Sequence, residues 1–107
     1  MIEKVYNYTT GDDKVIEQLV QDDPVQINHM ILPKGAALPE HYSNSNVYMI
    51  VFRGNLSLRL DDQDTHVYNY GQIINVPYKT KMNVSNQDEE ILEFMVVKAP
   101  HPKNYEE

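Results

Sequence analysis

The chain has 107 residues, about the length of one globular domain, and a formal net charge of −7 from 16 acidic and 9 basic residues. This acidic balance disfavours nucleic acid, whose phosphates are bound by Lys and Arg, and no apolar run approaches the roughly 20 residues of a membrane span. The chain has no cysteine, which excludes disulfides, zinc–thiolate sites and cysteine nucleophiles. We therefore expect a cytoplasmic protein with neither a membrane nor a nucleic-acid partner.

Short apolar runs separated by turn residues predict an all-β chain. Residues 14–20 fit either a strand or a helix, and the turn formed by Asp22, Asp23 and Pro24 favours a hairpin strand. The clearer strands are residues 25–32, 46–52, 56–60, 65–70, 73–76, 81–84 and 91–97.

This pattern predicts a barrel of about 8–10 short strands with little or no helix, since a closed or double-sheet barrel leaves few open strand edges. We expect a single domain over residues 1–107. Within it we place N-terminal strands in residues 2–20, a core barrel at about residues 25–98 and a C-terminal tail at residues 99–107.

The spacing of several residues resembles the two sequence motifs of the cupin family. Cupins carry a first motif, G-x5-H-x-H-x3-E-x6-G, and a second, G-x5-P-x-G-x2-H-x3-N. The matching frame positions are Gly35, His41 and Gly54 in the first motif, and Gly71, Pro77 and Asn86 in the second. The resemblance covers roughly residues 25–97 and implies a double-stranded β-helix, or jelly-roll, barrel with one small-molecule pocket.

The departures from these motifs fall on the residues that bind the family's metal. The resemblance implies ligands at four positions, and only His41 keeps a ligand of the family's type. The other three positions hold Ser43, Val47 and Met82, and Lys79 replaces the second glycine of the second motif. A divalent transition metal needs three or four converging N or O donors. We therefore favour no metal cofactor.

A remodelled site is the alternative, and it depends on where His29 points. His29 shares one face of its strand with Ile27 and Ile31. If that face points inward, His29 and His41 could hold a divalent metal weakly, together with water or Ser43. The other interpretation is that His29 is a hydrogen-bonded residue of the core or the rim.

The candidate ligand pocket is a mixed set of polar and apolar residues near His41. Its members are His29, His41, Ser43, Val47, Met49, Tyr78, Met82 and Phe94. The alternative is that the apolar members simply fill the barrel core, since barrels of this size either fill with side chains or hold one small ligand. His101, flanked by prolines, is expected in an exposed tail, unless that tail folds over the barrel mouth.

One strand is apolar on both faces, which suggests an assembly. Alternation places Tyr48, Ile50 and Phe52 opposite Met49 and Val51. An outward apolar face needs cover, either from the N-terminal strand or from a second subunit. We therefore expect a homodimer.

Three functions follow from these observations. The first is a small-molecule-binding cupin that lacks the family's metal site. The second is a metal-dependent enzyme with a remodelled site around His29 and His41. The third is a structural or sensory homodimeric module with a filled barrel. The sequence identifies neither a substrate nor a reaction.

Overall fold

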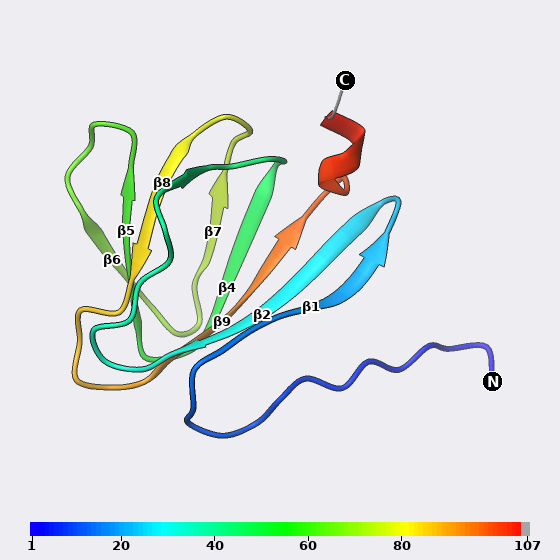
Figure 1. Ribbon diagram of the computed structural model, residues 1–107, viewed down its shortest axis with the longest axis horizontal. Helices are drawn as coiled ribbons and strands as arrows, with labels where there is room; N and C mark the ends of the chain where they lie inside the picture. The colour runs from blue at the N-terminus through cyan, green and yellow to red at the C-terminus, as the bar shows by residue number, and fades with distance from the viewer. Residues whose placement is uncertain (106–107) are drawn as a thin grey trace.

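Two antiparallel β-sheets face each other in the computed structural model, which describes residues 1–105 (Figure 1). The first sheet has the strand order β1-β2-β9-β4-β7, and the second has the order β3-β8-β5-β6. The elements are β1 (Val15–Asp22), β2 (Val25–Leu32), β3 (His41–Tyr42), β4 (Val47–Arg53), β5 (Asn55–Leu60), β6 (His66–Asn69), β7 (Ile73–Val76), β8 (Lys81–Ser85), β9 (Leu92–Lys98) and a 3-10 helix, η1 (Pro102–Tyr105). The predicted all-β, double-sheet barrel with little helix is confirmed.

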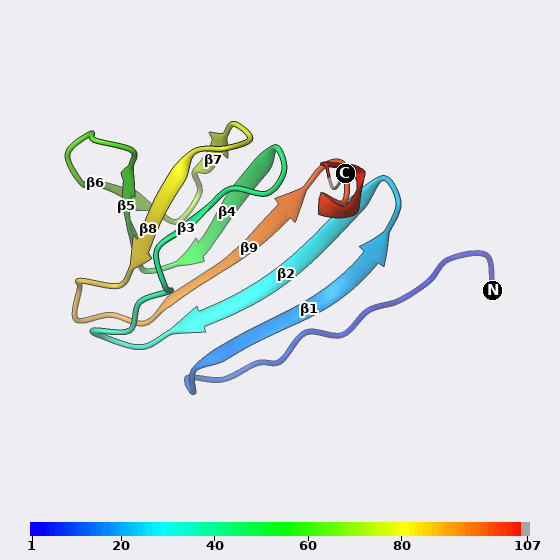
Figure 2. The same ribbon diagram turned by 45° about the horizontal axis from the view of Figure 1, so that its top comes forward.

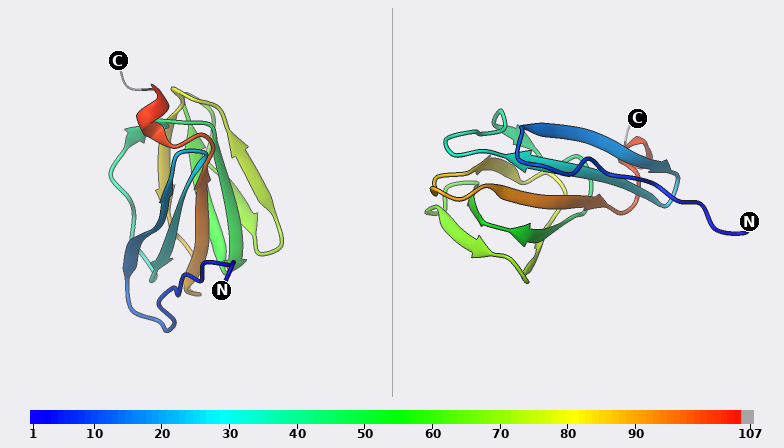
Figure 3. Two further views of the ribbon diagram at one scale, coloured as in Figure 1. Left: turned by 90° about the vertical axis from the view of Figure 1, so that its right-hand side faces the viewer. Right: turned by 90° about the horizontal axis from the view of Figure 1, so that it is seen from below.

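The space between the sheets is filled by apolar side chains that recur at every second residue of a strand. Val47, Met49 and Val51 of β4 are at most 2% exposed, and the intervening residues face outward. Phe94 of β9 and Met82 of β8 belong to the same buried cluster, so both sheets contribute to one core. The tilted views show the two sheets curving around this shared interior (Figures 2 and 3).

The N-terminal region differs from the prediction. The strand expected within residues 2–20 begins only at Val15 and forms an antiparallel hairpin with β2, whereas residues 1–14 form no strand. These residues run beside the first sheet and project past the hairpin (Figures 1 and 2). Side chains hold the segment in place: the backbone N–H and the hydroxyl of Thr9 each donate a 3.0 Å hydrogen bond to the Glu17 carboxylate.

The C-terminal segment, residues 99–105, packs against the end of the barrel. The His101 ring donates a 2.8 Å hydrogen bond from Nε2 to Gln21 Oε1 in the β1–β2 hairpin. The Tyr105 ring lies 4.0 Å from that of Tyr78, centroid to centroid, in the β7–β8 turn. The segment is therefore folded over the end of the barrel, and the expectation of an exposed, extended tail was wrong for His101. Residues 106–107 of the predicted tail lie outside the described residues. Within residues 1–105, no helix is long and apolar enough to cross a membrane.

Candidate functional site

The barrel mouth, which we define as the end bounded by residues 43–46, 77–80 and 99–105, carries the four motif positions at which the family binds its metal. His41 of β3 and Met82 of β8 are direct cross-strand partners, so their side chains lie on the same side of the sheet. Met82 is buried in the core, whereas His41 is exposed because β3 is an edge strand. The His41 ring donates a 2.8 Å hydrogen bond from Nδ1 to the Pro39 carbonyl, so its neutral form presents Nε2 as an acceptor.

The other motif positions supply poor donors for a metal ion. The hydroxyl of Ser43 donates to the Pro77 carbonyl at 2.5 Å and accepts from the Thr80 N–H at 2.8 Å, so it is already engaged in the loop. Val47 is fully buried and Met82 is 3% exposed, both within the apolar cluster. These side chains do not offer the three or four converging N or O donors that a divalent metal needs.

The apolar members of the predicted pocket lie together in the core. Val47, Met49, Met82 and Phe94 are all at most 3% exposed and belong to one cluster. Their positions agree with the alternative interpretation, in which these side chains fill the barrel. Tyr78 lies apart from them, at the surface of the barrel mouth.

His29 lies on the opposite side of the first sheet from this core. Met30 and Leu32 belong to the core cluster, so alternation along β2 turns Ile27, His29 and Ile31 outward. Thus Ile27, His29 and Ile31 share one face as predicted, but that face does not point inward, so the condition for a site shared by His29 and His41 is not met. His29 is nonetheless fully buried, because Tyr8 of the N-terminal segment covers it with the two ring centroids 4.8 Å apart.

Two carboxylates hold the buried His29 ring. Nδ1 donates to Glu17 Oε2 and Nε2 donates to Glu93 Oε2, each at 2.6 Å. The hydrogen bond from His29 is the main cause that lowers the pKa of Glu17 below its ordinary value. Because these carboxylates lie at opposite edges of one ring, His29 is a hydrogen-bonded structural residue and has no ring nitrogen left for a metal.

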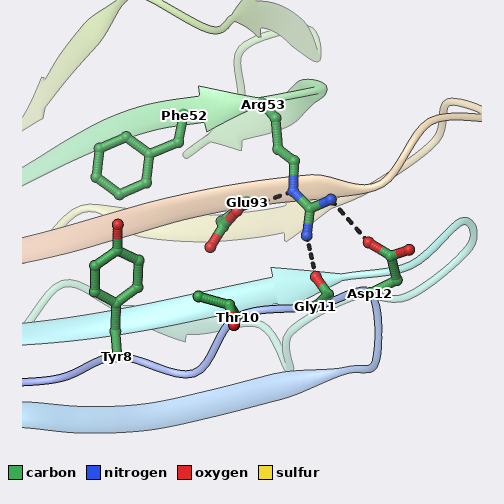
Figure 4. Close-up of a pocket in the computed structure, with 7 residues that line it drawn as sticks. All are labelled: Tyr8, Thr10, Gly11, Asp12, Phe52, Arg53 and Glu93. Carbon is green, nitrogen blue, oxygen red and sulfur yellow. Dashed lines mark hydrogen bonds and ion pairs between the residues drawn. The ribbon is translucent and has the colours of Figure 1, made fainter.

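A cavity of about 340 Å³ lies beside this cluster, on the outer face of the sheet. Tyr8 and Phe52 line one part of it, and Arg53 lines another (Figure 4). Arg53 Nε donates to Glu93 Oε1 at 2.9 Å, and Nη1 donates to Asp12 Oδ1 at 2.9 Å. The bond to Asp12 is the main cause that raises the pKa of Arg53. The charged groups of this cavity are thus already paired with one another.

Polar residues on the inner face of the first sheet were missed by the sequence reasoning. Gln26 and Asn28 share the core-facing side of β2 with Met30 and Leu32, and Lys98 continues the core-facing side of β9. Gln26 and Val47 are the cross-strand partners of Lys98 on the neighbouring strands. Period-2 alternation along β2 is the sequence signal that groups Gln26 and Asn28 on one face. It does not show which face points inward, because β2 has apolar residues on both faces.

Two positions of the second motif, Lys79 and Asn86, have structural roles in the loops of the barrel. Lys79, at the position of the family's second glycine, has φ 64°, a left-handed conformation that glycine adopts most readily. Asn86 is 1% exposed and donates hydrogen bonds from Nδ2 to the carbonyls of Leu32 and Glu90. The Asn86 side chain therefore closes the loop between β8 and β9 rather than facing a ligand.

Comparisons with known proteins identify the family. No protein-family model matches the sequence. The chain is 51% identical over 104 residues to the uncharacterized protein MJ0764 of Methanocaldococcus jannaschii, covering 96% of this chain and 90% of that one. The crystal structure of MJ0764, described as an RmlC-like cupin family protein with a double-stranded β-helix fold, matches with a TM-score of 0.94 at 50% identity, covering 97% of this chain and 96% of that one. A cupin superfamily protein of Desulfitobacterium hafniense shares the fold at 15% identity, with a TM-score of 0.73 over 88% of this chain and 84% of that one. The chain therefore belongs to the cupin superfamily.

Proposed function

We propose that this chain is a small-molecule-binding cupin that works without the family's metal. The observation that carries the proposal is the state of the motif positions: the Ser43 hydroxyl is engaged, and Val47 and Met82 pack in the apolar core. His41 alone keeps a strong donor, and one imidazole does not hold a divalent ion. We place the protein in the cytoplasm, because a chain without cysteine needs no oxidising compartment.

The inner side of the barrel mouth is the better place for the ligand. The outer cavity is large enough for a small molecule, but Arg53, Glu93 and Asp12 there satisfy one another. On the inner face, by contrast, Asn28 Oδ1 is buried and has no hydrogen-bond partner among residues 1–105. Binding sites combine mostly apolar side chains with a few polar groups that fix the ligand's orientation, and Asn28 lies among apolar core residues in this way.

Elemental analysis tests the absence of the metal. The protein is produced in medium supplemented with manganese, iron, nickel and zinc, and the metal content of the purified chain is measured. We expect far less than one equivalent of any of these metals. A stoichiometric metal that survives gel filtration would overturn the proposal.

A second observation favours a homodimer. Phe52 and Ile73 remain 43% and 66% exposed on the outer face of the first sheet, and Val5 of the N-terminal segment is 68% exposed. The N-terminal segment thus covers His29 but leaves other apolar side chains uncovered, and a second copy would bury them. Light scattering should give twice the 12.5 kDa of one chain, and a monomer across the micromolar range would contradict the proposal.

A further inference from the structure

The inner face of β2 carries a buried acceptor that has no hydrogen-bond partner in the described part of the chain. Asn28 is 6% exposed, and its Oδ1 is the one buried side-chain oxygen or nitrogen of residues 1–105 that accepts or donates no hydrogen bond. Buried polar groups in native proteins are nearly always paired, because an unpaired one loses its hydration without compensation. Oδ1 therefore lacks a donor that a bound molecule could supply.

A lysine that has no acidic partner among residues 1–105 lies next to this acceptor. Asn28 pairs with Val96 on β9, and Lys98 is two residues further along the same face of that strand. Such diagonal neighbours are within reach of a long side chain. No carboxylate among residues 1–105 lies within ion-pair distance of the Lys98 ammonium group, and burial lowers the pKa of Lys98.

We propose that the inner side of the barrel mouth binds a small hydroxycarboxylic acid. The ligand's carboxylate accepts from the Lys98 ammonium group, and its hydroxyl donates to Asn28 Oδ1. The inference rests on the proposed function and names the ligand class for that site.

The surroundings of the two groups favour a small and partly apolar acid. Val47 and Met49 of β4 lie across the strand from Lys98 and Val96 and are at most 2% exposed. In such a setting the attraction between an ammonium group and a carboxylate is stronger than in water. Because the C-terminal segment with Tyr105 packs over this end of the barrel, we expect the ligand to have few atoms.

Calorimetric titration of the full chain with L-lactate tests the inference. Propionate has the carboxylate without the hydroxyl, and lactamide has the hydroxyl without the charge. If both contacts form, lactate binds at least about ten-fold more tightly than either analogue, since each analogue leaves one polar group of the site unpaired. Equal affinity for the three molecules, or no saturable binding of lactate, would overturn the inference.

Two variants test whether Lys98 and Asn28 contact the ligand. Lys98→Met and Asn28→Leu should each weaken lactate binding by about ten-fold or more, while Lys34→Met, an exposed lysine paired with Glu89, should leave it unchanged. Asn28→Leu should also raise the unfolding midpoint, because it replaces an unpaired buried amide with an apolar group of similar size. If both variants bind lactate like the parent chain, the inference is wrong.

The metal analysis on the same preparation keeps the two proposals distinguishable. If the protein is free of metal but does not bind lactate, the proposed ligand class is wrong and the proposed metal-free function is unaffected. Stoichiometric metal overturns the metal-free function, whatever the titration gives.

Discussion

Replacing His29 with alanine removes the centre of the charged cluster under the N-terminal segment. Glu17 and Glu93 each accept a 2.6 Å hydrogen bond from the ring, and their side chains are only 25% and 13% exposed. A hydrogen bond to a charged group contributes about 1.5–3 kcal/mol, and the substitution removes two such bonds. We therefore expect His29→Ala to lower the free energy of unfolding by about 3–5 kcal/mol, a large part of the roughly 5–15 kcal/mol that holds a domain folded.

Urea denaturation followed by circular dichroism measures this loss. The parent and variant are compared at one protein concentration, because the apparent stability of any chain that self-associates depends on concentration. His66→Ala is the control, since His66 is exposed on β6 and its loss should change the stability by no more than about 0.5 kcal/mol. A loss below about 1 kcal/mol for His29→Ala would show that the cluster contributes little beyond an exposed ion pair.

Three further predictions concern the motif positions and the acidity of the cluster. Val47→Glu restores the family's acidic residue inside an apolar core, so it should lower the free energy of unfolding by at least about 3 kcal/mol, and added manganese should not recover the loss in urea denaturation. The depressed pKa of Glu17 stabilises the fold at neutral pH and this contribution disappears on acidification, so the difference in unfolding midpoint between the parent and Glu17→Gln should shrink as the pH falls below 4.5. Gly54→Ala should cost roughly 2–6 kcal/mol in the same denaturation assay, because φ is +75° and the new Cβ overlaps the Ile91 carbonyl, whereas Gly71→Ala, with φ +89° and open space, should cost only about 1–3 kcal/mol.

The strands and the barrel could be predicted because their signals are local. Val25–Leu32 and Ile73–Val76 match the predicted strands at both ends, since turn residues bound the runs on either side. The motif glycines also helped to predict the fold. Gly54, for example, has a positive φ and packs closely against Ile91, and few other residues tolerate either.

The candidate site was predicted less well, because it depends on which face of β2 points inward. Ile27 and Ile31 are apolar on one face, and Met30 and Leu32 are apolar on the other, so alternation alone does not decide. The deciding contact is tertiary: Tyr8 of the N-terminal segment packs against His29, which is fully buried on the outer face, away from the barrel core. Nothing in the local pattern around His29 indicates a segment about 20 residues earlier in the chain.

The two faces of β2 distinguish a polar group kept for stability from one available for binding. His29, on the outer face, is fully buried and has both ring nitrogens paired with carboxylates, so every donor it carries stabilises the folded chain. Asn28, one residue earlier on the inner face, is nearly as buried, but its Oδ1 has no hydrogen-bond partner within residues 1–105. An unpaired buried oxygen costs stability, and an apolar residue at that position would avoid the cost. The same chain pairs both ring nitrogens of His29. The missing partner of Asn28 Oδ1 within residues 1–105 is therefore better explained by the proposed ligand on the inner face than by a general tolerance of unpaired buried polar groups.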